Sequence, residues 1–459
     1  MTIGPSDPNQ PALSRLVQWL APAAEFHSVY VQYDDTGDHC LHTLRAVPAN
    51  QTLVSVSHSH MLTVDVAMES SIGRQLTQRW PNDTSRHAYL AAYLLTEAAK
   101  GSESAWWPYL QSLPASTAHL ASAWSEEELQ WLQGTEALEI ARENQQDIRN
   151  SYEQARALPS FPFTYESYAH ARRLVFSRVF SYAAANGNRS STLVPLTDLI
   201  NHASKGRYNT EWTYNTTLQV FTMYSTAPLA AHQPLLTSYG LKCNSELLTG
   251  YGFVVEDNER EAVAMEYEGV EQDGTPVAKT TRLKASYGDS HSMLLVLNMR
   301  RSALHDVIAQ LKGRLHRAQS QTLTEEELSE KQRGMRVMVE RRLVQRLAEA
   351  VRKVDDRYGG DREAEAARLA EWSGEKGKQW QALVVRVGER RVLQWWLDVC
   401  ALGEHWLADG VSSAQSWEGE RAEVERLKVQ LLVRDAWVKA LEDEKAEHAR
   451  SARATMIEL

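Results

Sequence analysis

The residues best suited to chemistry stand in one short stretch, LVPLTDLINHAS, which spans residues 193–204. It contains Asp198 and, near its end, the adjacent pair Asn201 and His202. An amide beside an imidazole can form a turn, ligate a metal, or line the floor of a ligand pocket. On the pair alone a turn is the simplest interpretation, because asparagine readily adopts turn geometry.

Four further side chains on either side of this stretch could take part in a site. Tyr239 in SYG and Tyr251 in GYGF offer hydroxyl groups, although tyrosines are often half-buried strand residues with one hydrogen bond. Arg178 in SRVF carries the forked donors that suit a carboxylate. Phe180 follows it, and either walls an apolar pocket or packs in the core.

The histidines of SHSHM are the other candidate for chemistry. His58 and His60 follow a strand pattern, and the sequence offers no nearby cysteine or third ligand. A protein-bound zinc ion usually has at least three protein ligands. We therefore interpret both as surface or turn histidines, and we expect no metal site.

Two strand-rich segments must position the candidate residues. SVYVQY and TLVSVS in the N-terminal part alternate apolar and polar residues, as half-buried strands do. Helical periodicity then predicts helices over roughly residues 66–190, including a helix that carries Arg178 and Phe180. Residues 191–257 return to strand texture in STLVPL, TLQVFTMY, PLLTSYG and YGFVVEDN. The pattern predicts one β-rich unit whose separated halves meet in space.

The C-terminal part is typical of helices. Thr324 and Glu327 form a capping box, Leu343, Leu347 and Val351 recur every four residues, and YGG at 358–360 ends that run. Near-heptad spacing over 424–441 fits a coiled coil or a packed or solvated terminal helix, and the shortness of the stripe favours the latter. We divide the chain into a flexible start (1–12), a β-rich domain in two parts (13–65 and 191–260), a helical insert (66–190), a connecting segment (261–289) and a helical domain (290–459).

Composition excludes several classes of protein. A chain of 459 residues is long enough for two or three domains. The net charge of -10 argues against a dedicated nucleic-acid binder, and we expect no direct nucleic-acid partner. The three cysteines are scattered, and the sequence shows no signal-peptide pattern and no long apolar run, so we expect a protein of the cytosol or nucleus without a membrane partner. We also expect a monomer.

The segments FSRVF, LVPLTDLINHAS and LLTSYGLKCNSELLTGYGFVVEDN follow one another in this order along the chain. In their order and spacing they resemble the signature segments of SET-domain methyltransferases. The similarity is to the branch of Rubisco large-subunit methyltransferase. The segments ESAWWPYLQSLPAS and WSEEELQWLQGTEAL also resemble the helical insert of that branch. It covers about residues 27–257. It implies an α+β fold: a pseudoknotted β-rich SET domain split by a helical insert and followed by an all-α C-terminal domain.

The resemblance implies a transfer of methyl from S-adenosylmethionine to a protein lysine. The substrate would be a protein, such as a ribosomal protein or translation factor, bound partly by the C-terminal helical domain. The implied catalytic residues are Tyr239 and Tyr251. The implied cofactor-binding residues are Gly37, Arg178, Asn201, His202 and Tyr239. The implied substrate-binding residues are Phe180, Asp198, Tyr251 and Phe253, although Asp198 could equally cap a turn.

Two departures from the family pattern support a second hypothesis. Asp38, His39 and Cys40 stand where the family's first cofactor loop has a Gly-x-Gly segment, and His232 and Gln233 replace a Gly-Glu pair. The alternative function is therefore a weak or inactive SET-domain protein that acts as a protein-binding module.

Overall fold

The computed structural model describes residues 2–3, 10–33, 39–81, 84–184, 189–270, 276–284 and 341–408. The chain forms two compact units. Unit 1 comprises residues 1–130 and 137–258, and unit 2 comprises residues 131–136 and 259–459. Within the described ranges, no helix combines the length and apolar character that crossing a membrane requires.

The largest sheet of unit 1 is antiparallel and joins the two strand-rich segments of the sequence. Its order is β10–β11–β5–β2. The strands are β2 (Ala24–Phe26), β5 (Thr52–Ser57), β10 (Thr210–Asn215) and β11 (Val220–Ser225). Phe221 pairs with Val56 and Met223 with Val54, and all four side chains are fully buried. The prediction that the separated halves meet in one β-rich unit is therefore confirmed.

Three smaller sheets complete the strands of unit 1. One contains β1 (Thr2–Ile3), β3 (Val29–Tyr33) and β4 (His39–Thr43). Another contains β6 (Leu62–Thr63), β8 (Arg189–Leu193) and β7 (Phe180–Ala183). The third is the short parallel pair β9 (Asn201–His202) and β12 (Leu236–Thr237).

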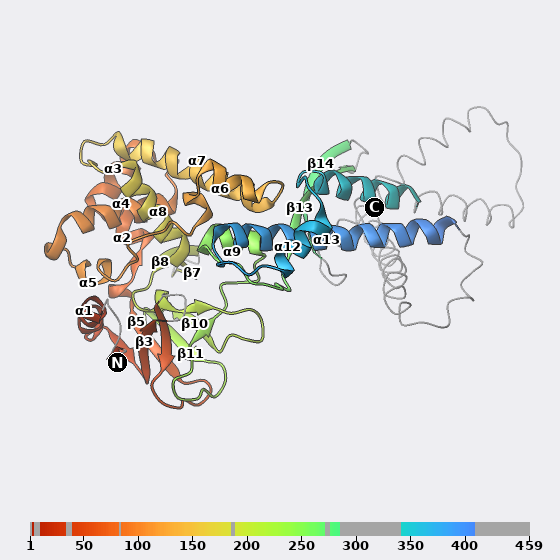
Figure 1. The fold of residues 1–459 in the computed structure, drawn as a ribbon. Coiled ribbons are helices and arrows are strands. Elements are labelled where there is room, and N and C mark those ends of the chain that lie inside the picture. Colours follow the sequence, from red (N-terminus) through yellow and green to blue (C-terminus); the bar gives the residue numbers. More distant parts are fainter. Residues whose placement is uncertain are drawn as a thin grey trace, which may run out of the picture. The chain divides into compact units, whose positions relative to one another are not determined.

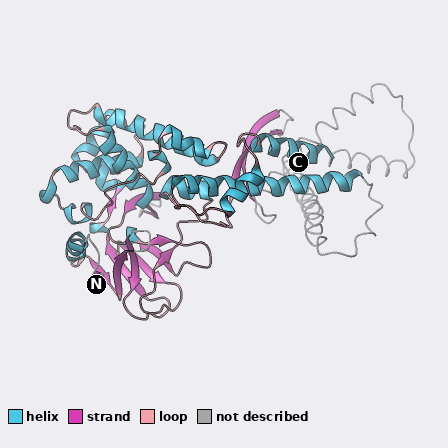
Figure 2. Ribbon diagram, viewed as in Figure 1, coloured by secondary structure: helices cyan, strands magenta, loops and turns pink. Residues whose placement is uncertain are grey.

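The helices of unit 1 lie mostly in a layer on one side of the largest sheet, but α1 lies beside the strands (Figures 1 and 2). They are α1 (Gln10–Leu20), α2 (Val64–Glu69), α3 (Ser71–Arg79), α4 (Arg86–Ala99), α5 (Trp107–Leu110), α6 (Glu126–Leu129), α7 (Glu136–Arg156), α8 (Tyr165–Arg178) and α9 (Asn244–Tyr251). Short 3-10 turns are η1 (His58–His60), η2 (Gly101–Glu103), η3 (Ala121–Ala123), η4 (Gln130–Leu132) and η5 (Thr197–Leu199). The predicted capping box of Ser125 and Glu128 begins α6.

The helical segment ends earlier than the sequence predicts. We expected helix to about residue 190, but α8 ends at Arg178, and Val179 adopts an extended conformation. The run Val179–Tyr182 contains one β-branched and two aromatic residues, which favour strand. Phe180 therefore opens strand β7, and its predicted place on a helix is wrong.

Helix α9 lies in a region that we predicted to be strand. It begins at a capping box, in which Glu246 accepts a hydrogen bond from the backbone N–H of Cys243 (3.2 Å). It ends at Gly252, whose φ of 80° is left-handed. The helix signals at both ends of α9 outweigh the strand-like texture of the flanking residues. The segment YGFVVEDN is therefore not a strand, and its first residue, Tyr251, is the last residue of α9.

Gly252 gives a testable prediction about stability. A Cβ at this position would lie 2.2 Å from Cδ2 and 3.1 Å from the backbone carbon of His119, in addition to the left-handed φ. We expect Gly252→Ala to lower the free energy of unfolding by about 3 kcal/mol, in urea titrations. Gly206→Ala is the control, because Gly206 has a similar φ of 81° but no atom within 4 Å. Its expected cost is about 1 kcal/mol, and equal costs at both sites would contradict the steric argument.

Unit 2 combines a hairpin with helices. Strands β13 (Ala262–Val270) and β14 (Pro276–Lys284) pair antiparallel within the segment that we predicted only to connect domains. A helix covers 341–355, followed by α12 (Arg362–Ala370) and α13 (Lys378–Ala408). Leu343, Leu347 and Val351 are buried, as their four-residue spacing predicts. The predicted capping box at 324–327 and the heptad-like tail at 424–441 lie outside the described residues.

Candidate functional site

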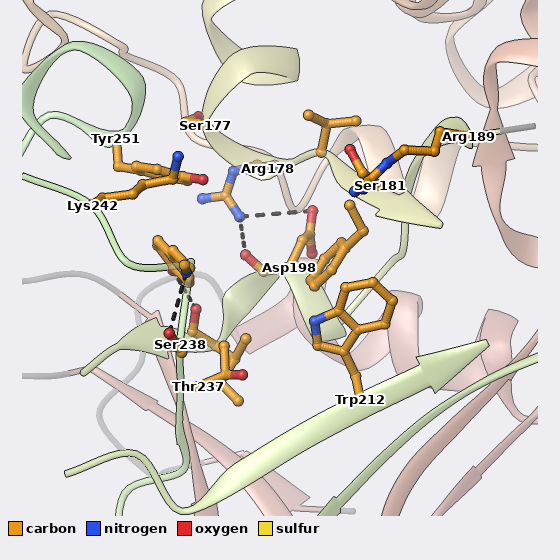
Figure 3. A pocket seen from close by; sticks show the side chains of 15 residues that line it. Ser177, Arg178, Ser181, Arg189, Asp198, Trp212, Thr237, Ser238, Lys242 and Tyr251 are labelled. Carbon is orange, nitrogen blue, oxygen red and sulfur yellow. Dashed lines mark hydrogen bonds and ion pairs between the residues drawn. The ribbon is translucent and has the colours of Figure 1, made fainter. Parts of the chain in front are cut away.

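Unit 1 contains a cavity of about 450 Å³ at the place where α8 ends (Figure 3). It is enclosed by the α8–β7 junction, η5, β10, the loop after β12 and α9. Its lining residues are Ser177, Arg178, Val179, Phe180, Ser181, Arg189, Asp198, Ile200, Trp212, Thr237, Ser238, Tyr239, Gly240, Lys242 and Tyr251. The cavity thus collects side chains that are up to 74 positions apart in sequence, since it joins Ser177 to Tyr251.

The parallel pair β9–β12 brings the Asn-His pair to the loop that carries Tyr239. Asn201 lies opposite Leu236, and His202 lies opposite Thr237. The backbone N–H of Ala203 donates to the carbonyl of Thr237 (3.0 Å) and extends this pairing. The pair is therefore part of a short strand beside the cavity, and the interpretation as an isolated turn is wrong.

His202 holds the start of the Tyr239 loop. Its Nδ1 accepts a hydrogen bond from the backbone N–H of Tyr239 (3.0 Å), and its ring packs 5.1 Å from the Tyr239 ring. Burial lowers the pKa of His202, and nearby Lys242 lowers it further. The imidazole is therefore neutral at physiological pH, as an acceptor nitrogen must be.

Tyr239 places two oxygen atoms together in the cavity. Its hydroxyl donates to the backbone carbonyl of Ile200 (2.6 Å), and both residues line the cavity. The ring of Tyr251 packs against Tyr239 with centroids 4.5 Å apart. Burial, reinforced by the Glu246 carboxylate, raises the pKa of Tyr251, so its hydroxyl stays protonated at neutral pH.

Arg178 and Asp198 form a charged pair at the cavity wall (Figure 3). Arg178 Nη1 donates to the backbone carbonyl of Asp198 (2.8 Å) and lies 3.7 Å from its carboxylate Oδ2. The same Oδ2 accepts a hydrogen bond from the hydroxyl of Tyr109 (2.8 Å), which is completely buried. Burial raises the pKa of Asp198, against the opposing effects of Arg178 and Tyr109. Asp198 thus orients Arg178 rather than only capping a turn.

An aromatic wall closes another side of the cavity. Phe180 packs edge-on against Trp212 and Phe221, with centroids 5.5 and 5.1 Å away, and these two rings stack on each other. Phe180 and Trp212 face the cavity, whereas Phe221 is buried beneath them. This wall suits the alkyl stem of a long side chain.

The structure brings most of the predicted site residues together. Arg178, Phe180, Asp198, Tyr239 and Tyr251 line the cavity. The other predicted residues that the structure describes lie next to it: Asn201 and His202 in β9, and Phe253, whose ring is 5.7 Å from that of His202. Gly37 and Asp38 lie outside the described residues.

The sequence analysis missed three contributors: Tyr109, Trp212 and Lys242. Tyr109 lies in the insert, and only the fold brings its hydroxyl to Asp198. Trp212 belongs to the edge strand β10, where the alternation of polar and apolar residues in EWTYN was the available signal. Lys242 stands three residues after Tyr239, and this proximity was the one available signal.

Among the residues that depart from the family pattern, the structure describes Cys40 and His232 but not Asp38. Cys40 is buried in β4, with its Sγ 3.0 Å from Nε2 of His42 and 3.3 Å from the backbone carbonyl of Gln32. His232 has a left-handed φ of 60°, and its Nδ1 lies 3.3 Å from the hydroxyl of Tyr30. Neither Cys40 nor His232 lines the cavity.

The histidines of SHSHM lie in a turn, where each contacts an aromatic residue. His58 Nδ1 lies 2.9 Å from the hydroxyl of Tyr214, and His60 packs against Trp19. Both lie in the 3-10 turn η1 and are partly exposed, as we predicted for turn histidines. No group of three or more metal-ligating side chains exists among the residues that the structure describes.

Comparison with known proteins agrees with the resemblance found in the sequence. No family model matches the chain. The chain is 29% identical over 228 residues to the ribosomal lysine N-methyltransferase set10 of Schizosaccharomyces pombe, covering 48% of this chain and 40% of the relative. It is 28% identical over 252 residues to the chloroplastic Rubisco large-subunit N-methyltransferase of Nicotiana tabacum, covering 50% and 48%. The chain thus spans less than half the length of these relatives.

Solved structures share the fold. The SET domain of Rubisco large-subunit methyltransferase (LSMT), bound to lysine and S-adenosylhomocysteine (AdoHcy), matches with a TM-score of 0.67 and 21% identity, over 91% of this chain and 98% of that one. A structure of the same methyltransferase bound to S-adenosylmethionine (AdoMet) matches with a TM-score of 0.66 and 22% identity, over 91% and 99%. The predicted α+β SET-domain fold and the resemblance to the LSMT branch are confirmed.

Proposed function

We propose that this chain, which has the fold of SET-domain methyltransferases, transfers a methyl group from S-adenosylmethionine to a lysine of a protein substrate. One observation carries the proposal: the Tyr239 hydroxyl and the Ile200 carbonyl oxygen lie 2.6 Å apart in a cavity with an aromatic wall. Two such oxygens can hold a polarised methyl group through weak C–H···O contacts. Curated relatives that are protein-lysine methyltransferases support the same activity.

The residues at the cavity fit the cofactor in their chemistry. S-adenosylmethionine supplies a carboxylate, an adenine ring and an activated methyl group. Arg178 presents forked donors for the carboxylate, as its placement at the cavity wall allows. The Asn201 amide and the neutral His202 lie on β9. Their polar groups would form hydrogen bonds with the remaining polar groups of the cofactor. Solved structures with this fold hold AdoMet or AdoHcy, which supports the assignment.

The work of the chain in this reaction is alignment. Phe180 and Trp212 would exclude water and hold the alkyl stem of the target lysine. Tyr239 and Ile200 would orient the methyl group for in-line displacement by the lysine nitrogen. Holding the reactants in line can lower the activation free energy of methyl transfer by roughly 7–11 kcal/mol at best.

The protein substrate belongs to the proposal as well. Because the relative from Schizosaccharomyces pombe is a ribosomal lysine methyltransferase, we propose a ribosomal protein or translation factor. We also propose that the helical unit 2 binds part of the substrate.

Labelled methyl transfer tests the proposal. The full chain is incubated with tritiated S-adenosylmethionine and total yeast ribosomal proteins, and the labelled residue is identified by mass spectrometry. The expected result is a labelled band that carries methyl-lysine. Calorimetry separates the alternative function: cofactor binding at micromolar concentration supports the enzyme, whereas no heat at millimolar cofactor would favour a binding module that has lost activity.

A further inference from the structure

The cavity carries an excess of positive charge. Its lining contains the basic side chains Arg178, Arg189 and Lys242, and the one acidic lining residue is Asp198. The Asp198 side chain is 1% exposed and is engaged by Arg178 and Tyr109. The accessible charged groups of this lining are therefore cationic, and they would repel a protonated lysine.

Lys242 is a cavity-lining cation that lies beside the tyrosine pair. Its ammonium lies 6.0 Å from the ring centroid of Tyr251, which packs against Tyr239 (Figure 3). Its stem folds over Gly240, where an added Cβ would lie 3.7 Å from Cε of the lysine. Among the described residues no acidic side chain forms an ion pair with Lys242. Its charge is thus directed toward the cavity without a counter-ion.

A lysine can accept a methyl group only after it loses its proton. A free lysine has a pKa of about 10.4, so almost all of it is charged at neutral pH. A like charge nearby disfavours the charged form. Resting on the function proposed above, we propose that Lys242 is an activating residue: its ammonium repels the protonated target lysine and so holds the incoming amine in its neutral, nucleophilic form.

Other charged groups in and beside the cavity either reinforce or oppose the charge of Lys242. Arg178 and Arg189 have the same sign as Lys242, and Asp198 opposes them from η5. On α9, the Glu246 carboxylate also opposes, but it accepts a hydrogen bond from the backbone N–H of Cys243. His202 on β9 is a neutral imidazole because burial lowers its pKa, and the Tyr251 hydroxyl stays protonated because burial raises its pKa. The Tyr239 hydroxyl donates to the Ile200 carbonyl. Within the part of the chain that the structure describes, Lys242 therefore lies beside Tyr251 without an acidic partner.

The transfer balances with one proton released to solvent. The target ammonium first loses a proton to water. The lone pair of the neutral amine then forms the new N–C bond to the methyl group while the S–C bond breaks, and the electron pair of that bond stays on sulfur. Lys242 takes no part in bond making and acts through its charge.

Lys242→Gln tests the inference, because it removes the charge and keeps a side chain of similar shape. A unit charge several ångströms away in a half-buried pocket shifts a pKa by roughly one unit. In the variant the pKa that governs kcat should rise by about one unit, so that kcat near pH 7 falls about tenfold. At alkaline pH, where the amine is neutral in either protein, the variant should recover to within about twofold of the unsubstituted protein. Lys242→Arg should keep the original profile.

The measurement is label transfer from tritiated S-adenosylmethionine to total yeast ribosomal proteins at saturating concentration, from about pH 6.5 to about pH 10.5. Lys205→Gln, at an exposed lysine outside the cavity, is the matched control and should leave the profile unchanged. An unshifted profile in Lys242→Gln, or an equal loss of rate at every pH, would overturn the activating role while the enzyme proposal stands. Absence of transfer by the unsubstituted protein at every pH would overturn both.

Discussion

Replacing Tyr239 by phenylalanine is expected to lower kcat for methyl transfer about 100-fold while leaving the fold intact. The hydroxyl that is lost donates to the Ile200 carbonyl at 2.6 Å, whereas the ring that remains still packs against Tyr251 and His202. The free energy of unfolding should therefore change by only about 1 kcal/mol, the usual cost of one hydrogen bond.

The size of this effect separates two roles for the hydroxyl. A C–H···O contact contributes about 0.5–1 kcal/mol, so losing one contact to the methyl group would slow the reaction only about two- to fivefold. A misalignment near 1 Å can cost about 100-fold. Since the hydroxyl also fixes the Ile200 carbonyl, we expect its loss to disturb alignment as well as contact.

Tyr224→Phe is the matched control for this experiment. Tyr224 is on β11, donates its hydroxyl to Glu211 (3.1 Å) and does not line the cavity. Its rate should be unchanged. Full activity in Tyr239→Phe would remove the hydroxyl from the mechanism, and an unfolded variant would show that its role is structural.

The sequence was sufficient where a signal was local or carried by a motif. Alternation in TLVSVS identified β5, and the capping box of Ser125 and Glu128 identified the start of α6. The ordered motifs placed Arg178, Asp198 and Tyr239 at one site, which the cavity brings together. These features depend on a few neighbouring residues in the sequence or on a resemblance. Both can be recognised without knowledge of the tertiary packing.

The sequence was insufficient where tertiary contacts decide the outcome. Phe180 begins a strand because β7 pairs with β8, a partner that local periodicity does not specify. Tyr109 reaches Asp198 across 89 positions, and its position in the insert gave no sign of this bond. The hairpin β13–β14 lay in a segment that we assigned only to connect domains, although Met265–Glu268 alternates apolar and charged residues. This signal was too short to identify the partner strand, which the pairing defines.

Asp198 combines a cost to stability with a functional position. Burial raises its pKa above that of an unfolded chain, although Arg178 and Tyr109 favour the charged form. Between the two pKa values the folded protein binds more protons than the unfolded chain, so the contribution of Asp198 to stability falls as pH rises through this window. Above this window the charged carboxylate therefore destabilises the fold.

Two substitutions of Asp198 should consequently behave in opposite ways. Asp198→Asn removes the charge but keeps an oxygen that accepts from Tyr109, so we expect equal or greater stability at about pH 8, and a smaller difference from the unsubstituted protein at about pH 5. Asp198→Ala leaves the buried Tyr109 hydroxyl without its acceptor and should lower the free energy of unfolding by about 3 kcal/mol. Both should slow methyl transfer about tenfold or more, because Arg178 loses its counter-charge.

Urea unfolding at both pH values, together with label transfer, measures these effects, and Tyr109→Phe completes the set. If the hydroxyl and the carboxylate act as a pair, Tyr109→Phe combined with Asp198→Ala should cost less than the sum of the single changes. The argument predicts that stability and activity separate in Asp198→Asn. An asparagine variant as unstable as the alanine variant, with its activity retained, would show instead that the carboxylate charge supports the fold and leaves Arg178 unaffected.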